Sequence, residues 1–157
     1  MLKNLDEIDL KIIKLLQENA KSTIKEMADQ LNLSNTPVFD RIKRLEKNGV
    51  ITGYAAKINR DALGLNLMTF CTLTLKGHRA EYLDDFQREV NELAEVVECY
   101  HLTGTFDYLL KVLVKDMADY QGFITKKLTK LSNIDKVQSS FVLTELKNET
   151  TLPQNIF

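Results

Sequence analysis

Residues 24–45 read IKEMADQLNLSNTPVFDRIKRL, which is two amphipathic helical patterns separated by a break of three residues. Thr23 and Glu26 form a capping box that starts the first pattern. Asn32 lies in the break and tolerates the left-handed backbone that a tight turn between helices needs. Two short helices joined in this way are typical of a helix-turn-helix, which we expect at about residues 24–43.

The second helical pattern carries a basic polar face. Val38, Ile42 and Leu45 recur at helical spacing and predict its buried side. Short polar side chains near a helix N-terminus can approach base edges in the DNA major groove, and arginine or lysine can pair with guanine or phosphate. The predicted DNA-binding residues are Ser34, Asn35, Thr36, Asp40, Arg41, Lys43, Arg44 and Lys47. The alternative is that these charges only solubilise an amphipathic helix, with Asp40 paired to Arg44 one turn later.

The segments on either side complete an N-terminal domain. Residues 5–16 repeat apolar side chains at helical spacing, and Asp6 is placed to cap the helix that this pattern predicts. Residues 51–59, after the basic helix, fit a strand or wing. We therefore expect a winged helix-turn-helix DNA-binding domain at residues 1–60, followed by a linker at residues 61–66.

The charges are distributed unevenly along the chain. The net charge is −1, but residues 1–60 carry 11 Lys and Arg against 8 Asp and Glu, a net charge of +3. The remaining residues carry 10 against 14, a net charge of −4. A basic block on an otherwise acidic chain favours a local polyanion site, most simply nucleic acid.

The rest of the chain alternates between strand and helix patterns. Runs rich in β-branched and aromatic residues fit strands at 67–76, 96–102, 107–115 and 137–143, and helical spacing fits 82–93 and 117–131. The order βαββαβ, with a tight hairpin at residues 103–106, is the split-βαβ, ferredoxin-like arrangement. The predicted fold class is therefore α+β, a winged helix-turn-helix followed by a ferredoxin-like sandwich at residues 67–157. Helices on one face of the sheet leave the other face open, and an apolar open face would favour a homodimer.

The predicted hairpin is also a candidate site for a small effector. A free amino acid needs N–H donors for its carboxylate, an acceptor for its ammonium group and a wall for its side chain. The residues that can supply these groups are His101, Leu102, Thr103, Gly104, Thr105, Phe106 and Asp107. The alternative is a plain hairpin turn, in which Asp107 only holds the turn by hydrogen bonding.

Composition and spacing exclude several classes of protein. The 157 residues, 27% charged and 44% hydrophobic, are typical of globular domains. The apolar runs are too short to span a bilayer and the charged start lacks a signal-peptide core, so we expect a cytoplasmic protein. Cys71 and Cys99 show neither zinc spacing nor a disulfide framework and are expected to be free buried thiols. No pattern predicts a cofactor, a metal or a nucleophile, which leaves His101 with Asp107 as the candidate pair for an enzyme.

The combination of motifs resembles the Lrp/AsnC family of transcription regulators. The matching segments are LDEIDLKIIKLLQENA (residues 5–20), IKEMADQLNLSNTPVFDRIKRLEKNGVITGY (residues 24–54) and ECYHLTGTFDYLLKV (residues 98–112). The resemblance implies a winged helix-turn-helix joined to a ferredoxin-like amino-acid-sensing domain, dimers formed through the C-terminal sheets, and assembly of dimers into octamers. It also implies that Arg41 and Arg44 contact DNA and that Gly104 and Asp107 lie in an effector-site loop.

We therefore predict a sequence-specific transcription regulator that binds double-stranded DNA. Its assembly or its DNA affinity is expected to change when a small effector, an amino acid, binds. For this to happen, the effector must bind two alternative assemblies of the protein with different affinity. The alternative is a ligand-independent architectural protein that wraps DNA as a multimer. A homodimer that assembles to an octamer is expected in the first case, and a membrane partner in neither.

Overall fold

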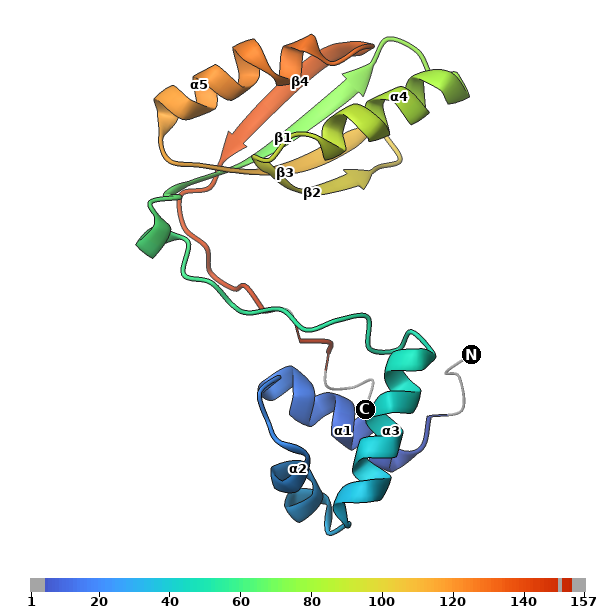
Figure 1. Ribbon diagram of the computed structural model, residues 1–157. Helices are drawn as coiled ribbons and strands as arrows, with labels where there is room; N and C mark the ends of the chain where they lie inside the picture. Colours follow the sequence, from blue (N-terminus) through green and yellow to red (C-terminus); the bar gives the residue numbers. More distant parts are fainter. Residues whose placement is uncertain (1–4, 150, 154–157) are drawn as a thin grey trace. The chain divides into compact units, whose positions relative to one another are not determined.

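The computed structural model describes residues 5–149 and 151–153 (Figure 1). The chain divides into two compact units, and the division falls between Lys57 and Ile58. The described residues from Lys147 onward cluster with the N-terminal unit. Each unit has its own apolar core.

The N-terminal unit is built from three helices, α1 (Glu7–Glu18), α2 (Ile24–Leu31) and α3 (Asn35–Lys47). They pack around a core of side chains that are at most 6% exposed, namely Ile12, Met27, Ala28, Val38, Ile42 and Leu45. Each helix contributes a stripe of apolar residues at helical spacing, which confirms the pattern predicted for all three.

The helix boundaries follow local capping chemistry. Asp6 and Thr23 cap α1 and α2, as predicted, and both do so through complete capping boxes, of which only the one at Thr23 was expected. Asn32 adopts φ 54° and ψ 45°, the left-handed conformation expected of the turn before α3. Ser34 stands at the N-cap of α3, but its side chain makes no capping hydrogen bond. That hydroxyl is therefore left for other partners.

The predicted wing strand is wrong. Residues 51–60 form no helix or strand in the described structure, although they follow α3 directly. A strand is stabilised by hydrogen bonds to a neighbouring strand, and the described residues of this unit contain no strand for it to pair with. The segment is almost entirely exposed.

An ion-pair network ties α1 to α3. The Asp9 carboxylate is fully buried and accepts hydrogen bonds from Arg41 Nη1 at 2.8 Å and from Arg44 Nη2 at 2.7 and 2.6 Å. Arg41 Nη1 also donates to Asp6 at 2.6 Å. The Arg41 guanidinium and the Asp9 amide hold the pKa of Asp6 below its usual value. The same groups that cap α1 therefore position two arginines of α3.

The C-terminal unit is a four-stranded antiparallel sheet with two helices on one face (Figure 1). Its elements are β1 (Leu67–Leu75), α4 (Ala80–Asn91), β2 (Val96–His101), β3 (Tyr108–Val114), α5 (Met117–Lys126) and β4 (Ile134–Phe141). The strand order is β2-β3-β1-β4, with short 3-10 helices at Asp61–Leu63 and Leu128–Lys130. This is the predicted ferredoxin-like βαββαβ arrangement.

The two faces of this sheet differ in character. Alternate residues of β1 and β3, such as Leu73 and Leu110, are buried against α4 and α5. The intervening residues face the other side and are half-buried, namely Phe70, Thr72, Leu109, Lys111 and Leu113. Lys111 lies 2.9 Å from Glu98 of β2 on this open side. The open face therefore carries both apolar side chains and an ion pair.

The two cysteines have different environments. Cys71 on the central strand β1 is buried, as predicted, but Cys99 on β2 is exposed, so the expectation that it is buried is wrong. The reason is topological, because β2 is an edge strand and has a neighbour on one side only. Burial raises the pKa of the Cys71 thiol.

No described helix is long and apolar enough to cross a membrane. Nor do the described His, Cys, Asp and Glu residues form a group of three or more that could hold a metal ion.

We predict that Asp9→Asn lowers the free energy of unfolding by roughly 2–4 kcal/mol, because two guanidinium groups lose a buried charged acceptor. Urea unfolding followed by circular dichroism measures the effect. Asp29→Asn is the matched control, since Asp29 is exposed on α2, and it should change the stability by less than about 0.5 kcal/mol. Equal effects of the two substitutions would contradict a structural role for the network.

Candidate nucleic-acid interface and effector site

The predicted DNA-binding residues gather on one side of α3, opposite its buried stripe. Seven of the eight are exposed, namely Ser34, Asn35, Thr36, Asp40, Lys43, Arg44 and Lys47. Arg41 is the exception, because its side chain is only 26% exposed and its guanidinium is bound to Asp6 and Asp9. The structure thus provides a polar surface on a helix that fits the width of the DNA major groove.

Arg44 is held and accessible at the same time. Its Nη2 atom donates to both oxygens of Asp9, yet the side chain is 50% exposed. The hydrogen bonds found for this guanidinium in the described structure all use Nη2, which leaves Nη1 and Nε as donors for a base or phosphate. The alternative pairing of Arg44 with Asp40 is wrong, because Asp9 takes that place. Asp9 was missed in the sequence because it lies 35 residues away from Arg44.

Lys43 and Lys47 differ in how they are engaged. Lys43 Nζ donates to Glu46 at 2.9 Å, and Glu46 also accepts from the Tyr54 hydroxyl at 3.0 Å. These two contacts, the lysine first, hold the pKa of Glu46 below its usual value. Lys47 is exposed and forms no ion pair with any described residue. Lys47 is therefore the cation on this face with the least competition for a phosphate.

The predicted effector hairpin is a tight turn between β2 and β3. The Leu102 amide donates to the Asp107 carbonyl oxygen at 2.7 Å and closes the loop. Gly104 has φ +117°, which a residue with a side chain rarely adopts. Thr103, Gly104 and Thr105 are exposed at its tip. In the described part of the chain, the backbone N–H groups of these three residues donate no backbone hydrogen bond.

Asp107 anchors the hairpin to the neighbouring strand. Its Oδ2 atom accepts from the Leu75 amide at 2.7 Å, and its Oδ1 atom lies 2.8 Å from His78 Nε2. Burial opposes its ionisation, but the Leu75 amide and the His78 imidazole together lower the pKa of Asp107. The carboxylate therefore links the hairpin to the end of β1 and forms no hydrogen bond inside the described turn itself, and each oxygen keeps acceptor capacity.

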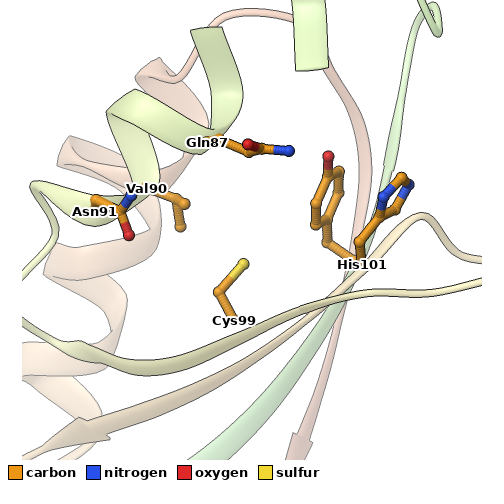
Figure 2. A pocket seen from close by; sticks show the side chains of 6 residues that line it. Gln87, Val90, Asn91, Cys99 and His101 are labelled. Carbon is orange, nitrogen blue, oxygen red and sulfur yellow. The ribbon is translucent and has the colours of Figure 1, made fainter. Parts of the chain in front are cut away.

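His101 belongs to a neighbouring pocket rather than to the hairpin tip. The pocket has a volume of about 210 Å³ and is lined by Gln87, Val90, Asn91, Cys99, His101 and Tyr108 (Figure 2). Its side chains come from α4 on one side and from β2 and β3 on the other. The His101 ring stacks on Tyr108 with 4.7 Å between ring centroids. Gln87 and Asn91 were not singled out from the sequence, although their spacing of four residues on a helix places them on one face.

The pair considered for catalysis is not formed. Asp107 bonds to His78, whereas His101 stacks on Tyr108. The two residues stand on either side of the turn with different partners, so the hairpin spacing reflects strand pairing and not an acid–base pair.

Comparisons with known proteins assign both halves of the chain. Residues 5–52 match the family model for winged helix-turn-helix DNA-binding domains. Residues 68–152 match the model for the Lrp/AsnC ligand-binding domain. The boundary between the two units, at Lys57 and Ile58, falls in the gap between the two matched segments.

Relatives and solved structures match over nearly the full length. The leucine-responsive regulatory protein of Haemophilus influenzae is 37% identical over 96% of this chain and 90% of its own. The glutamate uptake regulatory protein of Zymomonas mobilis is 36% identical over 98% of this chain and 93% of its own. A transcriptional regulator from Neisseria meningitidis, solved in complex with L-Met, superimposes with a TM-score of 0.92 at 36% identity, covering 97% of this chain and 98% of its own. The chain belongs to the Lrp/AsnC family of DNA-binding transcription regulators.

Proposed function

We propose that this regulator reads duplex DNA with the exposed side of α3 and changes its DNA affinity or assembly when a free amino acid binds its C-terminal unit. Such a protein acts on DNA in the cytoplasm. The observation that carries the proposal is the Asp9 network, which fixes a half-exposed arginine on a helix whose solvent side carries mainly polar and basic side chains. Because the chain belongs to a family of transcription regulators, we do not assign the His101–Asp107 pair a catalytic role.

The DNA-binding residues divide by what they can do. Ser34, Asn35 and Thr36 lie at the N-terminal end of α3, where short side chains and free backbone N–H groups can approach bases or phosphates. Arg44 retains donors for a guanine or a phosphate, and Lys47 suits a phosphate. Arg41 takes the supporting role, since its contacts to Asp6 and Asp9 hold α3 against α1.

Two neighbouring features of the C-terminal unit support an amino-acid site. The hairpin offers the backbone N–H groups of Gly104 and Thr105 for a carboxylate, and the Thr103 hydroxyl and Asp107 for an ammonium group. The pocket beside it adds the Asn91 amide and an apolar wall. His101 lines this pocket and is one of the effector residues expected from the sequence, so it connects the pocket to the proposed hairpin site. The L-Met complex of the similar Neisseria regulator supports this class of ligand.

The open face of the sheet supports a homodimer. Phe70, Leu109 and Leu113 lie on it, and the helices cover the opposite face only. A second copy of the same face would bury these side chains. In an isologous pairing, Lys111 of one copy would lie near Glu98 of the other, in addition to the Lys111–Glu98 pair within each copy. Dimers that assemble further to an octamer complete the proposed organisation.

We predict that Lys47→Ala weakens binding to all duplexes alike and reduces the slope of log affinity against log salt by about one unit, because one phosphate contact is lost. Arg44→Ala should weaken a selected duplex by about 1–3 kcal/mol and relax base preference if Arg44 reads a guanine. Fluorescence anisotropy titrations at several salt concentrations measure both. Lys14→Ala, an exposed cation on α1, is the control. Unchanged affinity in both α3 variants would exclude this face.

We predict that one of the twenty amino acids, supplied at 100 times its dissociation constant, stabilises the protein by about 2.7 kcal/mol, seen as a rise in melting temperature of several degrees. Thr103→Ala should reduce this rise if the hairpin forms the site, and Asn91→Ala should reduce it if the pocket does. A rise that survives both substitutions would place the effector elsewhere. No response to any amino acid would favour the architectural alternative.

We predict a pH signature for the Asp107 anchor. A carboxyl whose pKa is lowered on folding stabilises the fold above its unfolded pKa of about 3.9, and this contribution is lost as the pH falls through the folded pKa. The difference in unfolding free energy between the wild type and Asp107→Asn should therefore shrink below about pH 4. Urea unfolding at pH 7 and pH 3 measures it, and a difference independent of pH would contradict the anchor.

A further inference from the structure

Phe39 is an exposed aromatic side chain in the middle of the DNA-facing helix. Its side chain is 48% exposed, and it is the one large apolar residue classed as exposed on α1–α3, every residue of which the structure describes. Val38 before it and Ile42 after it are 0% and 6% exposed. The helix core is therefore complete without the Phe39 ring, and about half of the Phe39 surface remains exposed for contacts outside the unit.

Phe39 lies among the residues of α3 that are predicted to bind DNA. A single apolar side chain on a protein surface is ordinary and by itself needs no explanation. Phe39, however, adjoins Asp40 and lies one helical turn from Thr36 and from Lys43, three of the predicted DNA-binding residues. The ring therefore lies within the surface that α3 presents to DNA.

The charge beside the ring argues for a base rather than the phosphate backbone. The Lys43 ammonium lies 5.8 Å from the centre of the Phe39 ring and 2.9 Å from Glu46. The pairing with Glu46 offsets the lysine charge at this point of α3, whereas Arg44 and Lys47 lie farther round the helix. A phosphate gains little from a neutralised cation beside an aromatic ring, because phosphate contacts depend on positive charge.

The chemistry of base edges narrows the partner to one group. In the major groove, guanine, cytosine and adenine present hydrogen-bond donors and acceptors, and thymine adds the apolar 5-methyl group. A phenyl ring pressed on a polar edge would remove water without replacing its hydrogen bonds. The same ring pressed on the methyl group removes apolar surface from water on both sides.

We propose that Phe39 is a specificity-determining residue of this regulator, which packs its ring against the 5-methyl group of a thymine in the major groove. The inference rests on the proposed binding of duplex DNA through α3. It adds a direct reading of one base to a surface that otherwise consists of polar and charged groups.

The first step of the test is a selection of duplexes from a random library by the full-length wild type, Phe39→Ala and Phe141→Ala. Phe141 is the matched control, because it is also a phenylalanine, is similarly exposed at 40%, and belongs to the other unit. We expect a position at which the wild type and Phe141→Ala both enrich thymine and at which Phe39→Ala accepts any base. Retention of every thymine preference by a folded Phe39→Ala would overturn the proposal.

The second step removes only the methyl group. Each enriched thymine is replaced in turn by deoxyuridine, and affinities are measured by anisotropy. At one position the wild type should bind the deoxyuridine duplex about three- to fivefold more weakly, the contribution of one buried methyl group. Phe39→Ala should bind the thymine and deoxyuridine duplexes equally, whereas Phe39→Leu should keep part of the discrimination.

The outcomes separate this inference from the proposed function. Equal wild-type affinity for thymine and deoxyuridine at every enriched position overturns the role of Phe39, even if Phe39→Ala fails to fold, while DNA binding itself stands. Failure of the wild type to select any duplex overturns the proposed use of α3, and the inference with it. Circular dichroism of each variant shows whether a loss of binding reflects a loss of fold.

Discussion

The buried Asp9 carboxylate is the interaction on which the N-terminal unit depends. It has no exposed surface, and a buried charge is costly unless charged donors surround it. Arg41 and Arg44 supply those donors from a helix that starts 26 residues later in the chain. Because both arginines belong to α3, one network holds α3 against α1 and also positions the surface that we propose to face DNA.

Features that depend on neighbouring residues were predicted correctly from the sequence. The cap at Asp6, the capping box at Thr23 and the left-handed Asn32 depend on side chains within three residues of one another. The order of helices and strands in the C-terminal unit follows in the same way from apolar spacing. The family resemblance and the fold class were confirmed by the family models and by the similar structures.

Features that depend on distant residues were not predictable in this way. The partner of Arg44 is Asp9, 35 residues away, and no local pattern distinguishes it from Asp40 at one helical turn. Residues 51–60 have the composition of a strand but lack a described strand to pair with. Cys99 has an apolar context in the sequence, yet its place on the edge strand β2 leaves it exposed. Asp107 was expected at a ligand and is also an anchor, because its acceptors reach Leu75 on another strand.

The central claim is that Asp9 prepares Arg44 for DNA, and a double-mutant cycle tests it most directly. The affinities of wild type, Asp9→Asn, Arg44→Ala and the double variant are compared for one duplex selected by the wild type, at a temperature at which all four are folded. If Asp9 positions Arg44, the double variant should bind about as weakly as Arg44→Ala alone, a coupling of at least about 0.5 kcal/mol. Additive losses, with no coupling, would show that the network stabilises the helices without preparing the DNA-binding surface.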